Sequence, residues 1–201
     1  MELLELDTPH GPARAHLHAA VKPVGALLLG HGAGGSVTAR DLAAVTEAAL
    51  AARVSVALVE QPYRVAGRKA PAPAHQLDAA WTAAAAQLRG GPLAGLPVVA
   101  GGRSSGARVA CRTAAATGAI AVVCLAFPLV APSGTSRQDE LDGVEGSVLV
   151  VQGASERFGM PEPAERRTVV TVRGDHGLKS DLAGVAEAVA PWLMVQLARV
   201  G

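Results

Sequence analysis

Aromatic side chains are scarce in this sequence: two Trp, two Phe and one Tyr occur among 201 residues. Small residues supply much of the apolar content, which is 50% of the chain, so the mean hydropathy of +0.30 does not indicate membrane character. The longest compact apolar run, 119–131, contains Pro128 and is shorter than the roughly 20 residues that span a bilayer. The run predicts a buried strand and no membrane partner.

Charge of either sign is not in excess, because 18 Lys and Arg residues balance 17 Asp and Glu residues, for a formal net charge of +1. This balance provides no electrostatic basis for binding nucleic acid, so none is expected as a partner. The N-terminus, Met-Glu-Leu-Leu-Glu-Leu-Asp, lacks the basic and continuous apolar regions of a secretory signal, and we expect a cytoplasmic location. The oligomeric state, including a homodimer, stays open.

Cysteine is rare as well. Cys111 and Cys124 are the only two, and they form no Cys-x-x-Cys motif. Their apolar surroundings predict two isolated, reduced, buried thiols rather than a disulfide or a zinc site. His16 and His18 would share one face of a strand, but two histidines without a third ligand do not make a metal site. The sequence therefore predicts neither a metal nor a cofactor.

Short aliphatic runs alternate with Ala/Leu-rich segments along the chain. The runs have the length of buried strands and cover 26–29, 54–59, 97–100, 120–127, 147–151 and 168–172. The segments have the length of helices and cover 38–52, 75–89, 105–116 and 180–197. This alternation predicts an α/β fold with helices on both faces of a mostly parallel sheet. No repeat or linker divides the chain, so we expect one domain over residues 1–201.

The two ends of the chain carry further local signals. Apolar residues alternate with polar ones on both sides of the breaker at 9–12, which predicts an antiparallel hairpin at the edge of the sheet. In the last helical segment, Ser180 is the predicted N-cap. Pro191 predicts a kink or a restart of that helix, because proline has no backbone N–H.

The most informative feature is a strand followed directly by Gly-x-Ser-x-Gly and a helix. The motif is Gly102-Arg103-Ser104-Ser105-Gly106. In a nucleophile elbow of this kind a strained turn holds the serine, and the glycines remove Cβ atoms that would clash with the neighbouring strand and helix. We therefore expect the Ser104 hydroxyl to project from the carboxyl end of the sheet as a nucleophile. A glycine-rich turn with an exposed serine is the alternative.

A serine nucleophile needs a base, and the base needs an acid that orients it; in this kind of site both follow the serine in the order acid, histidine. Glu156 and His176 each follow one of the last two predicted strands. Because the carboxyl ends of parallel strands lie at one edge of a sheet, we expect Ser104, Glu156 and His176 to meet there as catalytic residues. Asp175 is a competing acid, although a residue adjacent to the histidine seldom reaches its neighbour's Nδ1.

Residues 30–35, Gly-His-Gly-Ala-Gly-Gly, form a glycine loop after the first long apolar run. Such a loop can aim a backbone N–H at the oxyanion that develops in acyl transfer, with the N–H of Ser105 as the second donor. The same residues match Gly-x-Gly-x-x-Gly, and Glu60 ends the next predicted strand, as in a dinucleotide-binding fingerprint. A nucleotide-dependent oxidoreductase is therefore an alternative, although it leaves the serine, acid and histidine motifs unexplained.

Six segments, taken together, carry a family resemblance over most of the chain. They are 30–35, 60–63, 101–108, 127–129, 148–159 and 174–176. They resemble the small, cap-less bacterial α/β-hydrolases akin to dienelactone hydrolase, and especially a branch related to the hydrolase-like subunit of the eukaryotic non-specific lethal chromatin complex. The resemblance implies an α/β-hydrolase fold with Ser104 as nucleophile, Glu156 as triad acid and His176 as base. It also implies that the backbone N–H groups of Ala33 and Ser105 form the oxyanion hole.

Two positions depart from the pattern of this family. The acid is usually aspartate, and Glu156 is one methylene longer. The residue after the nucleophile is commonly methionine in this branch, whereas here it is Ser105. Larger relatives insert a lid at the place where this chain has only residues 128–146, so we expect no lid domain. The site should be open and shallow, and suited to short acyl or other small soluble substrates.

The sequence thus predicts a serine hydrolase that cleaves a small carboxylic ester or thioester through an acyl-enzyme on Ser104. Arg103, beside the nucleophile, either binds a substrate carboxylate or forms a structural ion pair. The alternative from another class is a hydrolase-fold protein that acts as a non-catalytic binding or scaffold module, because one fold hosts many functions. A filled site, or a Ser104 hydroxyl far from the His176 ring, would favour the scaffold.

Overall fold

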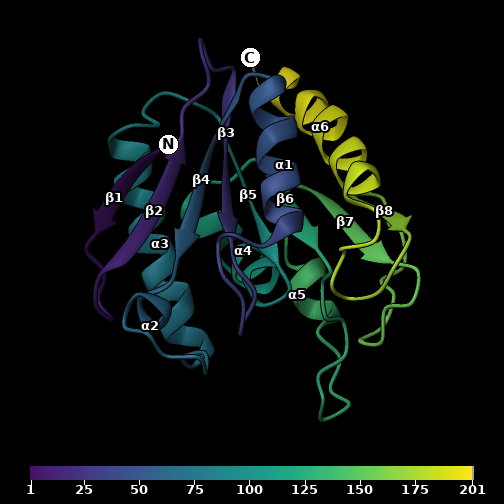
Figure 1. Ribbon diagram of the computed structural model, residues 1–201. Coiled ribbons are helices and arrows are strands. Elements are labelled where there is room, and N and C mark those ends of the chain that lie inside the picture. Colours follow the sequence, from purple (N-terminus) through teal and green to yellow (C-terminus); the bar gives the residue numbers. More distant parts are fainter. Residues whose placement is uncertain (201) are drawn as a thin grey trace.

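The computed structural model describes residues 1–200 and contains one eight-stranded sheet. The strands are β1 (Glu2–Leu6), β2 (Ala13–His18), β3 (Gly25–Gly30), β4 (Val54–Glu60), β5 (Val98–Arg103), β6 (Ala121–Leu125), β7 (Ser147–Gly153) and β8 (Arg167–Val172). The helices are α1 (Arg40–Ala51), α2 (Pro62–Val65), α3 (Ala74–Gly90), α4 (Ser105–Thr117), α5 (Gln138–Asp142) and α6 (Leu182–Ala198). The strands lie in the order β1-β2-β4-β3-β5-β6-β7-β8 (Figure 1).

The sheet is parallel from β4 to β8, and only the N-terminal edge is antiparallel. β1 pairs with β2, and β2 pairs with β4, in antiparallel register. All pairs on the other side of β4 are parallel. The predicted fold class, with its edge hairpin, is therefore confirmed.

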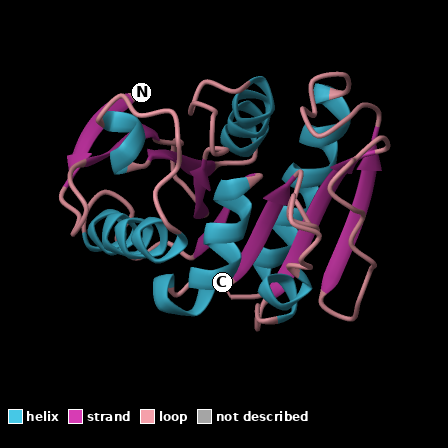
Figure 2. Cartoon of the chain, turned by 90° about the horizontal axis from the view of Figure 1, so that it is seen from below, coloured by secondary structure: helices cyan, strands magenta, loops and turns pink. Residues whose placement is uncertain are grey.

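Successive residues of a strand point to opposite faces of the sheet, so a continuous apolar strand makes both faces apolar. Helices cover each of these faces. In β3, Ala26 and Leu28 join a core layer with side chains of α3 and α4, whereas Leu27 and Leu29 join a second layer with side chains of α1 and α6. All four side chains are fully buried. The helices on the two sides of the sheet are visible in Figures 1 and 2. Continuous apolar strands are thus explained by burial on both faces.

The predicted N-cap of the last helix is wrong, and the helix does not restart at Pro191. The N-cap is Asp181, whose Oδ1 accepts the Gly184 N–H at 3.1 Å, and not Ser180. α6 also continues through Pro191 without a restart. Pro191 and the residue four positions earlier, Glu187, are both exposed, so water can solvate the carbonyl that loses its intrahelical partner. Buried apolar side chains on the opposite side hold both halves of the helix on the sheet.

The segment between β6 and β7 contains a loop and the short helix α5. The loop closes on itself through an isolated bridge between Val130 and Ser136. No lid domain lies here, in agreement with the sequence prediction. No helix in the described part of the chain is long and apolar enough to cross a membrane.

Candidate active site

Ser104 lies in the turn between β5 and α4 with φ of 52° and ψ of −108°, a conformation that a residue with a Cβ adopts only under strain. Its backbone N–H donates to the Leu125 carbonyl at 2.8 Å, which ties the turn to β6. A Cβ at Gly102 would lie 2.6 Å from the Gly30 carbonyl oxygen, and a Cβ at Gly106 would meet the same atom. Glycine at these two positions therefore allows β5 and α4 to approach β3 closely enough to form the turn.

The side chains of Ser104, Glu156 and His176 form one hydrogen-bonded chain. His176 Nε2 lies 3.0 Å from Ser104 Oγ, and His176 Nδ1 lies 2.7 Å from Glu156 Oε2. The Glu156 side chain is fully buried, and its Oε1 accepts the N–H of Phe158 at 3.0 Å. An acceptor at Nδ1 keeps a proton on that atom, so Nε2 is left to accept the serine proton. The Phe158 ring packs edge-on against the imidazole, with the ring centroids 4.8 Å apart.

The competing acid, Asp175, is exposed and points elsewhere. Its Oδ1 accepts the N–H of Gly177 at 2.8 Å. Among residues 1–200, Glu156 is the carboxylate that pairs with His176. The carboxylate that contacts the His176 ring therefore lies in the loop after β7.

Two backbone N–H groups at the nucleophile have no acceptor. They belong to Ala33, in the loop after β3, and to Ser105, the first residue of α4; neither donates to any acceptor in the described chain. Both residues line the same cavity as the Ser104 side chain. Free N–H groups at a helix N-terminus and in a glycine loop are suited to hold a negatively charged oxygen.

The glycine loop is held in place by His31, whose role the sequence analysis did not identify. His31 Nδ1 donates to the Gly32 carbonyl at 2.8 Å, and Nε2 accepts the N–H of Gln61 at 3.1 Å. Because Nε2 accepts from a backbone donor, the imidazole must be neutral. Burial lowers the pKa of His31, which acts in the same direction.

Tyr63 fixes the next residue of the same loop. Its hydroxyl donates to the Ala33 carbonyl at 2.7 Å, and its ring packs edge-on against His31 with centroids 5.8 Å apart. Burial raises the pKa of Tyr63 to about 12, so the hydroxyl stays protonated as a donor. The sequence held a signal for this residue: it is the only tyrosine, and it follows a strand end at the edge where the nucleophile lies.

Arg103 makes two contacts that hold neighbouring segments in place. Its Nε lies 2.8 Å from Oδ2 of Asp41 in α1, and its Nη2 donates to the His176 carbonyl at 2.9 Å. The Asp41 side chain is only 2% exposed. Burial raises the pKa of Asp41, and the neighbouring guanidinium opposes that shift. Of the two roles considered for Arg103, the structure supports the ion pair.

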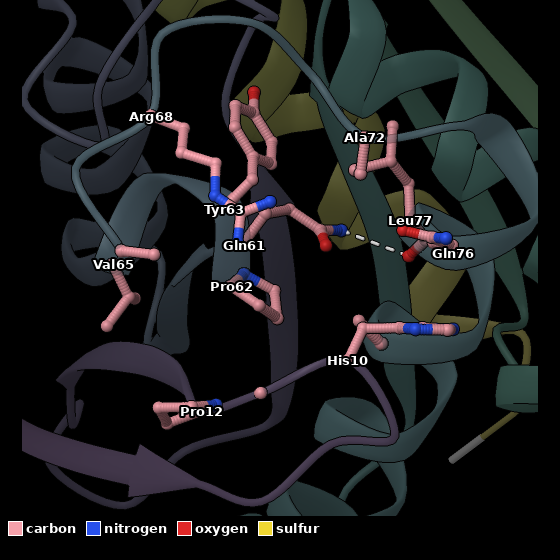
Figure 3. Close-up of a pocket in the computed structure, with 13 residues that line it drawn as sticks. His10, Pro12, Gln61, Pro62, Tyr63, Val65, Arg68, Ala72, Gln76 and Leu77 are labelled. Carbon is pink, nitrogen blue, oxygen red and sulfur yellow. Dashed lines mark hydrogen bonds between the residues drawn. The ribbon is translucent and has the colours of Figure 1, made fainter.

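A cavity of about 570 Å³ opens at the nucleophile. Its lining residues come from the glycine loop, the segment before α3, the elbow with the first turn of α4, and the loops after β6, β7 and β8: Gly32, Ala33, Gly34, Gly35, Pro71, Arg103, Ser104, Ser105, Arg108, Pro128, Pro132, Arg137, Arg157, Phe158 and His176. A second cavity of about 280 Å³ shares none of these residues. Figure 3 shows it beside Gln61, Pro62 and Tyr63, with the Gln61 amide donating to the Leu77 carbonyl.

The dinucleotide-binding hypothesis does not fit the structure. In that fingerprint the glycine loop opens a helix directly, whereas α1 begins at Arg40, beyond the loop 30–35. Glu60 Oε2 lies 3.9 Å from His16 Nε2 on the neighbouring strand β2. In the chain as described, no group of three or more His, Cys, Asp or Glu side chains is arranged to hold a metal.

The two cysteines are both buried and free, but they are not isolated from each other. The Sγ atoms of Cys111 in α4 and Cys124 in β6 lie 3.4 Å apart. Burial raises the pKa of Cys124 well above its usual value, so the thiol is protonated and unreactive at neutral pH.

Comparison with known proteins agrees with this architecture. A family model described as an alpha/beta hydrolase domain matches residues 23–184, so the chain belongs to the α/β-hydrolase family. No curated protein matches the sequence significantly. The family match does not distinguish the branch related to the chromatin-complex subunit from other α/β-hydrolases.

Solved structures share the fold at low sequence identity. Est1E from Butyrivibrio proteoclasticus has a TM-score of 0.82 at 16% identity, over 98% of this chain and 100% of that chain. A serine hydrolase without a lid, XC6422 from Xanthomonas campestris, has a TM-score of 0.74 at 20% identity, over 98% and 94%. Dienelactone hydrolase from Anabaena variabilis has a TM-score of 0.76 at 20% identity, over 96% of each chain. These proteins are similar in fold to this chain.

Proposed function

We propose that this protein is a serine hydrolase that cleaves a small carboxylic ester or thioester through an acyl-enzyme on Ser104. The observation that carries the proposal is the continuous chain from Glu156 Oε2 through the His176 ring to Ser104 Oγ, with contacts of 2.7 and 3.0 Å. A buried acid, a base and a serine in a strained turn form the arrangement that activates a hydroxyl for acyl transfer.

The reaction follows from this geometry. Ser104 Oγ attacks the substrate carbonyl carbon while His176 Nε2 takes the hydroxyl proton, and Glu156 stabilises the imidazolium that forms. The N–H groups of Ala33 and Ser105 hold the oxyanion, and each such donor contributes about 10²–10³ in rate. The imidazolium then gives its proton to the leaving alcohol or thiol. Water, deprotonated by the same Nε2, releases the acid from Ser104.

Ser104 rather than Ser105 is the attacking residue in this proposal. The hydroxyl within reach of His176 Nε2 belongs to Ser104, whereas Ser105 contributes its backbone N–H at the start of α4. The absence of a lid domain and the open cavity support a small soluble substrate over a lipid aggregate. The short serine–histidine contact and the unfilled cavity argue against the scaffold alternative.

The test is covalent labelling of the purified protein with a fluorophosphonate probe, read by intact mass. We expect the wild type and Ser105→Ala to gain one probe adduct and Ser104→Ala to gain none. An unlabelled wild type would contradict the proposal and favour a non-catalytic scaffold. Labelling that disappears in Ser105→Ala and persists in Ser104→Ala would move the nucleophile by one residue.

A further inference from the structure

Four arginines line the cavity at the nucleophile, and no Asp or Glu lies among its lining residues. They come from four places in the fold: the end of β5 (Arg103), the first turn of α4 (Arg108), the loop before α5 (Arg137) and the loop after β7 (Arg157). The chain as a whole has a formal charge of only +1, so this concentration of positive charge is local.

Two of the four guanidinium groups are already neutralised. Arg103 pairs with buried Asp41 at 2.8 Å. Arg108 makes a two-pronged contact with Glu140, through Nε at 2.8 Å and Nη2 at 2.5 Å. Glu140 also accepts from Arg112 at 3.1 Å, and that arginine pairs with Asp78 as well. Asp41 and Glu140 are therefore already paired with arginines of the fold.

Arg137 has no carboxylate partner within residues 1–200. Its Nη1 donates to the Pro128 carbonyl at 2.9 Å, which holds the half-buried side chain on the cavity wall and leaves its other N–H groups available. Burial and the charge of nearby Arg108 lower the pKa of Arg137, and the Glu140 carboxylate, which pairs with Arg108 and Arg112, only partly opposes that shift. A bound anion would relieve both effects.

Arg157 is also without a carboxylate partner in the described chain. Its guanidinium carbon lies 4.7 Å from the centre of the Phe158 ring, and that ring packs against His176 at 4.8 Å. The stack places an exposed guanidinium on the rim of the cavity, one aromatic ring away from the catalytic base. A planar guanidinium in this setting can donate two parallel hydrogen bonds to a carboxylate.

We propose, as an extension that rests on the proposed hydrolase function, that the substrate is an ester or thioester bearing a second, negatively charged group, a carboxylate in the simplest case. Arg137 and Arg157 bind this group at the cavity rim, while Ser104 attacks the neutral carbonyl. The inference rests on the two guanidinium groups beside Ser104 that have no carboxylate partner among the described residues. A substrate carboxylate can bind them without breaking an existing ion pair.

The experiment compares two pairs of esters that differ in one negative charge. The first pair places the charge on the acyl side: the mono-4-nitrophenyl ester of adipic acid against 4-nitrophenyl hexanoate. The second places it on the leaving group: 4-acetoxybenzoate against its methyl ester. The ratio of kcat/KM for the anionic over the neutral ester is measured for the wild type, Arg137→Gln, Arg157→Gln and the double variant. Arg166→Gln, which removes an exposed arginine outside the cavity, is the matched control.

We expect the wild type to prefer the anionic member of at least one pair. The ratio should fall about tenfold in each single variant, and further in the double variant, because each loses a charge-assisted hydrogen bond. High salt should reduce the wild-type ratio, and Arg166→Gln should leave it unchanged. Two outcomes would overturn the anionic-substrate proposal and leave the hydrolase function standing. In the first, the wild type labels with fluorophosphonate but prefers the neutral member of both pairs. In the second, the double variant keeps the wild-type ratio. A wild type that neither labels nor hydrolyses any ester overturns the hydrolase function itself.

Discussion

Arg103 and Arg157 border the same cavity, yet their surroundings differ in every respect that decides what an arginine can do. Arg103 is bound on both sides, to a buried carboxylate and to the carbonyl of His176. Arg157 is exposed and stacked on a single aromatic ring. We use the name inner wall for Arg103, Asp41, Glu156 and His31, because each is fixed by ion pairs or hydrogen bonds to the surrounding fold. We use the name rim for Arg137 and Arg157, which have no carboxylate partner in the part of the chain that the structure describes. The inner wall builds the geometry of the site, whereas the rim is left free to meet a ligand.

The largest expected effect concerns the acid of the inner wall. Glu156→Gln keeps the size of the side chain but removes the charge that stabilises the imidazolium, so kcat for an ester should fall by about 10³–10⁴. Asp175→Asn removes a carboxylate right beside His176 and should change kcat less than about threefold, because Asp175 bonds only to its own loop. Equal losses in the two variants would show that the acid is not Glu156.

The second effect is on stability. Arg103→Met leaves the buried Asp41 carboxylate without its partner, which should lower the free energy of unfolding by about 3 kcal/mol. Arg157→Met, on the rim, should cost less than about 1 kcal/mol. Urea unfolding measures both. Adding Asp41→Asn to the first variant should restore part of the loss, and a first variant as stable as the second would remove the distinction between inner wall and rim.

A smaller effect is expected at the glycine loop. Tyr63→Phe removes only the hydroxyl that holds the Ala33 carbonyl, so the oxyanion donor is less well positioned and kcat should fall about tenfold with little change in KM. Thr46→Val is the control, because it deletes another buried hydroxyl bond, to Leu42 in α1, with a similar cost in stability. If both variants lower kcat equally, Tyr63 has no positioning role.

The smallest effect is a pH dependence. Burial lowers the pKa of His31 in the folded protein below its ordinary value of 6.5, so the unfolded chain takes up the proton first as the pH falls. The contribution of His31 to stability is complete above pH 6.5 and decreases below it, by at most about 1.4 kcal/mol per pH unit. His31→Gln should flatten the dependence of unfolding free energy on pH below pH 6.5. Parallel curves for wild type and variant would mean that His31 is not neutral when folded.

Local signals explain why much of this molecule could be predicted from its sequence. All six aliphatic runs became strands and all four helical segments became helices. Strands β3 to β7 are continuous apolar stretches because both faces of the parallel sheet are buried there. The positions of Ser104, Glu156 and His176 followed from a second regularity, since each comes directly after a strand that ends at the same edge. Topology then brought them within hydrogen-bonding distance.

What the sequence could not predict depends on side-chain contacts between distant segments. Asp41 is one carboxylate among many in the sequence, and only the packing of α1 on the sheet brings it to Arg103. The neutrality of His31 depends on a backbone donor from Gln61, which no motif encodes. α6 does not restart at Pro191, because the cost of a proline depends on whether the freed carbonyl reaches water, which is decided by the orientation of the helix.

Arg103 also links Ser104 and His176 to each other. It precedes Ser104 in the chain, and its guanidinium holds the backbone carbonyl of His176, whose ring returns to Ser104 Oγ. These bonds close a ring that contains both Ser104 Oγ and His176 Nε2. A closed ring of contacts restrains the distance between Ser104 Oγ and His176 Nε2 more strongly than a single contact between two separate loops would.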